Sequence, residues 1–342
     1  MEPPFCLLDL PKESIKTILQ YSNIYDLISF SLCSEKMLAF VRDLNLDIFG
    51  FHLKSRDNFG ARLRFRGETI ELYFCEDGHG RQNVDNIDRH SRKLKVDYIE
   101  ATEQSQWCHA EGILPVAVTR QWRKANFSGK DWVCHFMKAF PCDKLRRSMS
   151  ITTSKYEIDS LWETVKDFDF DKLSFYRDLP KPYIMKVLKA FHSVEDFYVA
   201  SLSLDDSEHS VLLSNWRAYF IGSPLTLDQL LSTNSIEICT NHVLWDDLNR
   251  FIKLCVHGSN PRLQFVNVNY EGIRVIDENQ ILKGIRCKRI PEDTERTFVL
   301  YGYPAQIEII KRGFDVVGSK GRKATVIINN NYYRSFFRMY VW

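Results

Sequence analysis

The sequence lacks an excess of charge of one sign. Its 342 residues include 46 lysines and arginines against 44 aspartates and glutamates, which gives a formal net charge of +2. A protein that holds a long stretch of phosphate backbone carries a broad basic surface. The balance of charge therefore argues against a nucleic-acid partner.

Long apolar runs are also missing. No window approaches the roughly 18 apolar residues of a membrane-spanning helix. The opening Met1-Glu2-Pro3-Pro4 has neither the basic nor the apolar segment of a secretory signal. We therefore expect no membrane partner and a location in the cytoplasm or nucleus. Nine cysteines without regular spacing then predict reduced thiols and no disulfides.

Recognisable catalytic and metal-binding motifs are absent as well. Cys108-His109 and Cys134-His135 each place two ligand types side by side, but neighbours on one strand or helix point in different directions. Residues 313–320 imitate a phosphate-binding loop with its last residues exchanged, and they precede an apparent strand instead of a helix. We predict a hairpin there, and no catalytic residue, metal or cofactor.

The length allows about two domains, and an apolar content of 44% provides a sizeable core. Residues 5–45 have the pattern of three short helices, with Pro11 as a first helical residue and Asn23 and Ser34 as N-caps. A unit of about 40 residues buries too little surface to stand alone. Its apolar stripe is therefore completed by the rest of the chain or by another protein.

From Ser150 onward, strand-like and helix-like segments alternate. The strand-like runs are spaced by 19 to 28 residues and centre on Ile151, Phe175, Tyr198, Tyr219, Ile238 and Val266. Stretches with helical spacing lie between most of them, at 158–165, 184–191, 227–231 and 245–255. This period predicts an α/β fold with a leucine-rich-repeat-like strand–helix array, and an ordinary βαβ sheet is the alternative.

Two other regions have a different pattern. After residue 296, short apolar runs split by glycines predict an antiparallel β cap at the C-terminus. Residues 46–148 read as a mixed α/β segment with a β-hairpin about Gly67, and Arg89 to Lys95 as a solvated loop. The domains expected are thus 1–45, 46–148 and 149–342.

The first forty residues resemble an F-box. The resemblance rests on Phe5-x-Leu7-Leu8-x-Leu10-Pro11, Ile18-Leu19 and Asp26-Leu27-Ile28-x-Phe30-Ser31-Leu32-Cys33-Ser34-x-Lys36. It implies docking on the Skp-type adaptor of an SCF ubiquitin ligase, and through the adaptor on a cullin. The residues implied in adaptor binding are Leu8, Leu10, Pro11, Ile15, Ile18, Leu19 and Leu27. Alternatively, Leu10, Ile18 and Leu27 simply pack onto the following domain.

A second resemblance lies downstream. Residues 224–234, 248–253 and 258–263 are similar to the F-box-associated region of the large nematode F-box family, which implies that the C-terminal domain holds a substrate. Polar residues in or beside apolar strands predict an exposed face for that target. These are Arg217, Glu237, Gln264 and Asn267, and the alternative is that they merely solvate one side of a sheet.

Together these patterns predict a non-catalytic substrate-recognition subunit of an SCF-type ubiquitin ligase with an unknown protein target. One alternative is an F-box interaction protein that delivers nothing for ubiquitination. The other is an enzyme with a thiol nucleophile among the nine cysteines.

Overall fold

The computed structural model divides the chain into two compact units, Met1–Phe170 and Asp171–Trp342. The structure describes residues 7–56, 58–65, 68–77, 93–103, 118–142, 147–176, 179–199, 215–271, 275–291, 293–300, 306–318, 321–330 and 334–342.

The N-terminal unit opens with three short α-helices, as predicted. After the 3₁₀ turn η1 (Leu7–Asp9) come α1 (Lys12–Gln20), α2 (Ile24–Cys33) and α3 (Glu35–Asp43). The side chains of Asn23 and Ser34 accept backbone N–H bonds at the starts of α2 and α3, which confirms both predicted N-caps. Pro11 has an extended ψ of 144° and is the N-cap of α1, so its assignment as the first helical residue was wrong by one position.

A sheet with the order β6-β1-β2-β3-β4-β5 follows. Its strands are β1 (Ile48–Ser55), β2 (Phe59–Phe65), β3 (Thr69–Cys75), β4 (Tyr98–Glu103), β5 (Val118–Trp122) and β6 (Arg147–Ile151). Neighbours are antiparallel except β1 and β6. The pairing of β2 with β3 confirms the predicted hairpin, although Gly67 lies outside the described residues, as do residues 89–92 of the predicted loop.

Two helices, α4 (Gly129–Ala139) and α5 (Ile158–Val165), complete this unit. Trp132, Phe136 and Phe140 recur every fourth residue, are fully buried, and have neighbouring ring centroids 6.2 and 6.5 Å apart. Burying each such side chain contributes roughly 2–3 kcal/mol. A capping box between Ser128 and Asp131 fixes the start of α4.

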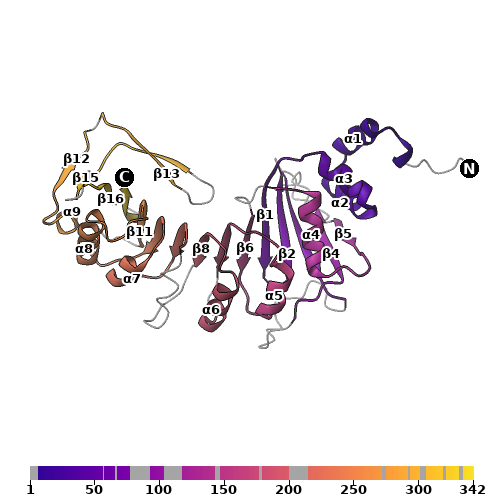
Figure 1. The fold of residues 1–342 in the computed structure, drawn as a ribbon, viewed down its shortest axis with the longest axis horizontal. Helices are drawn as coiled ribbons and strands as arrows, with labels where there is room; N and C mark the ends of the chain where they lie inside the picture. Colours follow the sequence, from indigo (N-terminus) through magenta and orange to yellow (C-terminus); the bar gives the residue numbers. More distant parts are fainter. Residues whose placement is uncertain are drawn as a thin grey trace, which may run out of the picture. The chain divides into compact units, whose positions relative to one another are not determined.

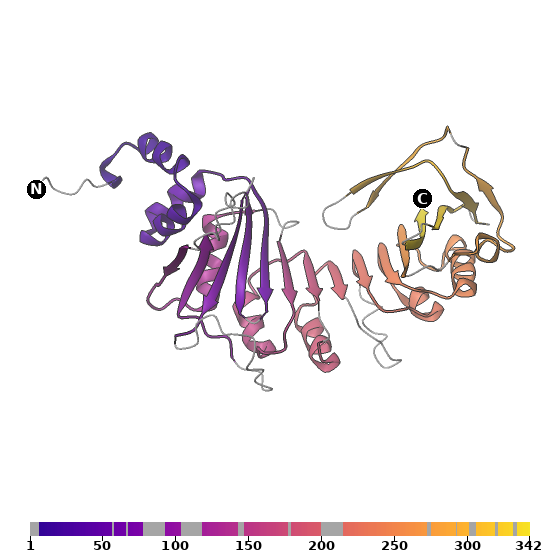
Figure 2. The same cartoon turned by 180° about the vertical axis from the view of Figure 1, so that it is seen from behind.

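The three N-terminal helices gain their missing contacts from the same unit. Arg120 of β5 forms an ion pair with Asp26 at 2.8 Å, and the indole N–H of Trp122 donates to the Ser29 hydroxyl at 2.8 Å. Figure 2 shows these helices at the β5 edge of the sheet. One side of α2 is therefore completed by the chain itself.

Five parallel strands form the first part of the C-terminal unit (Figure 1). They are β7 (Lys172–Phe175), β8 (Asp196–Val199), β9 (Ala218–Ile221), β10 (Glu237–Asn241) and β11 (Phe265–Glu271), with α6 (Lys181–Ala190), α7 (Leu227–Ser232) and α8 (Trp245–Val256) between them. Neighbours in the sheet are neighbours in sequence, without the reversal of order in a doubly wound sheet. The predicted repeat-like strand–helix array is confirmed.

The parallel strands keep one register across the unit. A fully buried row crosses all five at Leu173, Phe197, Tyr219, Ile238 and Val266. Side chains alternate between the two faces of a strand, so the next row belongs to the opposite, helix-free face. That second row is Ser174, Tyr198, Phe220, Cys239 and Asn267.

Antiparallel strands continue the sheet, as predicted for the C-terminal cap. The order β12-β15-β16-β17-β11 joins β12 (Cys287–Arg289), β15 (Phe314–Val317), β16 (Lys323–Asn330) and β17 (Arg334–Val341), while β13 (Arg296–Leu300) and β14 (Gln306–Ile310) form a separate hairpin and α9 (Glu278–Ile281) follows β11. Gly313 has φ of 139°, and a Cβ there would lie 2.5 Å from the Val326 carbonyl oxygen, so only glycine fits. The phosphate-loop-like stretch thus contains β15 of the β15–β16 hairpin.

A buried histidine links α2 to α4. The Ser31 hydroxyl donates its proton to the Ile28 carbonyl at 2.7 Å, so the Nε2 atom of His135, 2.9 Å from Ser31 Oγ, must be the donor. Burial, aided by Lys124 and Lys138, lowers the pKa of His135 from 6.5 to about 4.

The N-terminal unit should therefore lose stability as the pH falls from 6.5 to about 4. The unfolded histidine binds a proton in that window and the folded one does not, which favours the unfolded state by up to about 3 kcal/mol. Urea unfolding at several pH values should show this slope in the wild type. His135→Gln should flatten it, and an unchanged slope in this variant would contradict the assignment.

Candidate functional site

The sequence-predicted adaptor residues divide into two groups. Ile15, Leu19 and Leu27 are buried in the helical core, with 1, 0 and 3% of their surface exposed. Leu27 is thus already out of contact with solvent in the unbound chain, in keeping with the alternative that it packs within the chain. These three residues hold the helices together and cannot themselves contact a partner.

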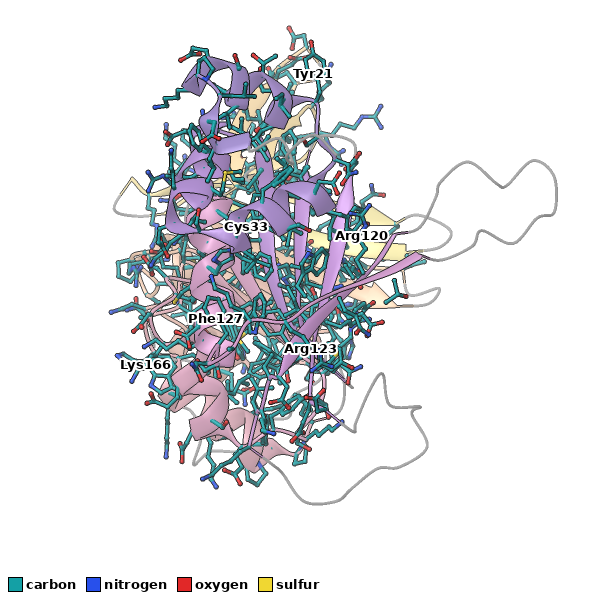
Figure 3. All side chains as sticks on the ribbon, turned by 90° about the vertical axis from the view of Figure 1, so that its right-hand side faces the viewer. Tyr21, Cys33, Arg120, Arg123, Phe127 and Lys166 are labelled. Carbon is teal, nitrogen blue, oxygen red and sulfur yellow. The ribbon has the colours of Figure 1, made fainter. Side chains whose placement is uncertain are left out.

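The other predicted residues remain accessible. Leu8 and Leu10 are half-buried, Pro11 is exposed, and Ile18 is 41% exposed. Tyr21, which the sequence did not single out, is 89% exposed and lies at the end of the helices away from Cys33 (Figure 3). Spacings of seven and three residues place Pro11, Ile18 and Tyr21 on one side of α1.

We call these five residues, Leu8, Leu10, Pro11, Ile18 and Tyr21, the α1 surface. All five side chains are at least partly exposed, and three of them share one side of α1, whereas isolated exposed apolar residues are ordinary. The signal that could have found Tyr21 is its spacing of three residues from Ile18, on the same side of α1.

The predicted target residues of the C-terminal unit also differ in accessibility. Arg217 donates to Asp171 at 2.6 Å, to Asp196 at 2.7 Å and to Glu195 at 3.0 Å. Two of these carboxylates are almost completely buried. Burial raises the pKa of Asp196 to about 6 against the opposing pull of the guanidinium. Arg217 thus ties together the starts of three consecutive strands.

Glu237 is only 4% exposed, so the expectation of an exposed face was wrong at this position. Gln264 is exposed, and Asn267 is half-buried and accepts a hydrogen bond from Arg338 at 3.3 Å. The backbone brings Arg217, Glu237 and Gln264 to the same end of adjacent strands, where Ile236 bonds to both Arg217 and Gln264. Asn267 lies further along β11.

An aromatic row on the helix-free face was missed by sequence reasoning. Tyr176 and Tyr198 have ring centroids 5.1 Å apart, and Tyr198 stacks on Phe220 at 4.3 Å. Lys172 extends over the Tyr198 ring at 5.4 Å. Tyr176 is half-exposed and the other two rings are partly exposed. The period-2 alternation in β8 and β9 was the available signal, but it could not tell which face the helices leave open.

Two protein-family models match the chain, one over the N-terminal helices and one over part of the parallel strands. The F-box domain model matches residues 7–49, and the model described as F-box associated matches residues 208–268. The chain carries an F-box domain and an F-box-associated domain. No curated protein and no solved structure matches it.

The residues that the two family models match include parts of the surfaces described above. The F-box match covers η1, α1, α2 and α3, including the whole α1 surface. The F-box-associated match covers β9, β10 and most of β11 with the helices between them. F-box and F-box-associated domains are typically non-catalytic adaptor or recognition modules, which act by binding other proteins.

Metal and thiol chemistry finds no support among the described residues. They contain no group of three or more His, Cys, Asp and Glu side chains that could hold a metal ion. Cys108 and His109 lie outside them, and the interior His135 is committed to Ser31. Burial raises the pKa of Cys255 to about 11, so its thiol stays protonated at neutral pH. No helix in the described part of the chain has the length and apolar character to cross a membrane.

Arg217→Ala should destabilise the C-terminal unit by on the order of 3 to 5 kcal/mol, because two buried carboxylates lose their cation. Urea unfolding of the full chain measures this change. Gln264→Ala, at an exposed position at the same end of the sheet, should cost less than about 0.5 kcal/mol. Equal unfolding midpoints for the two variants would show that the cluster contributes no stability.

Proposed function

We propose that this protein is the substrate-recognition subunit of an SCF-type ubiquitin ligase. Residues 1–45 would dock on the Skp-type adaptor and through it on a cullin, and residues 149–342 would hold a protein target, in the cytoplasm or nucleus. The proposal rests on one observation above all. The F-box match falls on three helices whose apolar α1 surface faces solvent.

The division of labour within the helices supports this role. α2 is anchored by an ion pair to Arg120 and by hydrogen bonds to Trp122 and His135. The α1 surface has no comparable contact in the described chain, and apolar patches of this kind form the centres of protein interfaces. A partner that binds α1 would therefore meet a group of helices that is already attached to its unit through α2.

The mechanism would be positioning. A target held by the same chain that binds the adaptor experiences a high effective concentration of the ligase's ubiquitin carrier. No reactive residue is required in the recognition subunit. This is consistent with an F-box and F-box-associated architecture, whose modules are typically non-catalytic.

For the target we propose the helix-free face of the C-terminal unit. Asn267 belongs to it, together with the aromatic row of Tyr176, Tyr198 and Phe220. The exposed Gln264 precedes β11, at the end of the sheet where these strands begin. Aromatic side chains provide much contact area at low conformational cost.

The decisive experiment is reconstitution. The protein is mixed with purified Skp-type adaptor and cullin, and co-elution on a sizing column is measured. Proteins that accumulate with it after proteasome inhibition are then tested for ubiquitination in the reconstituted ligase. Co-elution without ubiquitination of any captured protein would favour an F-box interaction protein that delivers no target.

The double variant Ile18→Asp, Tyr21→Asp should weaken adaptor binding by at least about 30-fold. A charge at each exposed position must be desolvated on docking, and losing such anchors costs upward of about 2 kcal/mol. Calorimetric titration with the adaptor measures the change, and the melting temperature should stay near that of the wild type because both side chains are exposed.

Gln20→Asp is the matched control. It adds a charge at an exposed position on the other side of α1 and should leave the affinity unchanged. Leu27→Asp should unfold the helical segment instead, since Leu27 is buried. Wild-type affinity in the double variant would contradict the proposed docking surface.

A further inference from the structure

A cavity of about 490 Å³ opens in the C-terminal unit beside the β13–β14 hairpin. Its volume is within the range of ligand-binding cavities. It is lined by Pro261, Leu263, Gln264, Phe265, Thr297, Phe298, Val299, Leu300, Arg322, Tyr340, Val341 and Trp342. Four segments thus meet there: β13, the start of β11 with the residues before it, the end of β17, and Arg322 just before β16.

The cavity meets β13 along its edge. The consecutive residues 297–300 all line it, although alternate side chains of a strand point to opposite faces. β14 pairs with the other edge of β13, and none of the described β14 residues belongs to the lining. Within the described chain, β13 pairs with no other strand. Its free N–H and C=O groups therefore face the cavity.

The hairpin is held in place from its inner face. The Phe298 ring stacks on Tyr340 at 4.5 Å, and Glu308 accepts from the Tyr340 hydroxyl at 2.7 Å and pairs with Arg338. On its outer face, Val299, Ile307 and Ile309 are more than half exposed. The open edge is therefore carried by an anchored strand.

One side chain of the lining is charged. It belongs to Arg322, whose guanidinium donates to the carbonyl groups of Cys255, Pro261 and Leu263. No carboxylate of the described chain lies within ion-pair distance of Arg322. Lys323 adds a second positive charge 4.8 Å from the Trp342 ring. An anionic group would find a cation whose charge is still uncompensated.

We propose that this cavity binds an extended acidic peptide segment, which adds to the free edge of β13 and places a carboxylate against Arg322. Strand addition supplies backbone hydrogen bonds, and neighbouring pockets select the side chains. Trp342, which is 47% exposed, and the exposed Val299 provide apolar contacts for those side chains. This inference rests on the proposed function, since the segment would belong to the target protein.

The test uses fluorescein-labelled seven-residue peptides and the full chain. One peptide alternates valine and threonine and carries two glutamates near its C-terminal end, and a second has glutamine at those two positions. We expect the acidic peptide to bind at least tenfold more tightly by fluorescence anisotropy, with the difference shrinking at high salt. Two further versions of the acidic peptide carry N-methyl groups on alternate backbone nitrogens, one along each edge of the extended peptide. The version methylated on the edge that pairs with β13 should not bind, whereas the other should. Equal affinities for the acidic and amide peptides, or indifference to both methylation patterns, would overturn the proposal.

Two matched pairs of variants locate the site. Arg322→Gln should weaken acidic-peptide binding at least tenfold, whereas Arg312→Gln, at an exposed arginine outside the lining, should not. Val299→Asp should repel the peptide, and Ile309→Asp, at a similarly exposed position on β14, should not. If Arg322→Gln impairs folding, the second pair decides. Equal affinities for Val299→Asp and Ile309→Asp would overturn the proposal.

Adaptor binding is measured on the same proteins. If the wild-type protein binds the adaptor but not the acidic peptide, the proposed peptide site is refuted and the proposed ligase function is not. Adaptor binding that fails in the wild type while the acidic peptide binds refutes the proposed function and retains the cavity as a peptide site.

Discussion

The common register of the parallel strands is the constraint on which the C-terminal unit depends. Each strand contributes one fully buried residue to the row from Leu173 to Val266, so a shift of one residue would move every side chain to the wrong face. Arg217 fixes the strand starts electrostatically by joining carboxylates that precede or begin β7 and β8. A regular helix-free face follows from that register, and it carries the aromatic row that we propose for the target.

In the N-terminal unit the constraint is size. Three short helices cannot bury enough surface alone, and the chain solves this by docking α2 on β5 and α4 through Asp26, Ser29 and Ser31. Leu27 of the same helix is buried in this unit. The exposed Ile18 of α1 is left for the adaptor that we propose, whereas the buried Leu27 fits the alternative of packing within the chain.

The periodicity of the sequence was sufficient to predict the three helices, the strand–helix array and the antiparallel strands after it, because burial of one face imposes a period on the residues. It was not sufficient to predict accessibility. Glu237 and Gln264 are both polar and stand at the starts of adjacent strands, yet one is buried and the other exposed. The difference in exposure depends on which residues of the neighbouring strands lie beside each side chain. Those neighbours are set by long-range strand pairing, which the local sequence pattern does not give. Tyr21 was missed for a different reason, since its spacing of three residues from Ile18 is a local signal that does not by itself give its exposure.

The position of the β13–β14 hairpin also depends on contacts between residues far apart in the sequence. Free strand edges tend to recruit other chains, and proteins commonly protect them with charge, proline or a covering element. Here the hairpin is anchored by Phe298 and Glu308, and the β13 edge faces a cavity whose one charged lining residue is Arg322. An anchored edge next to an uncompensated cation costs stability in an isolated chain and gains it when an acidic strand is added. This difference is the physical basis of the peptide site that we propose.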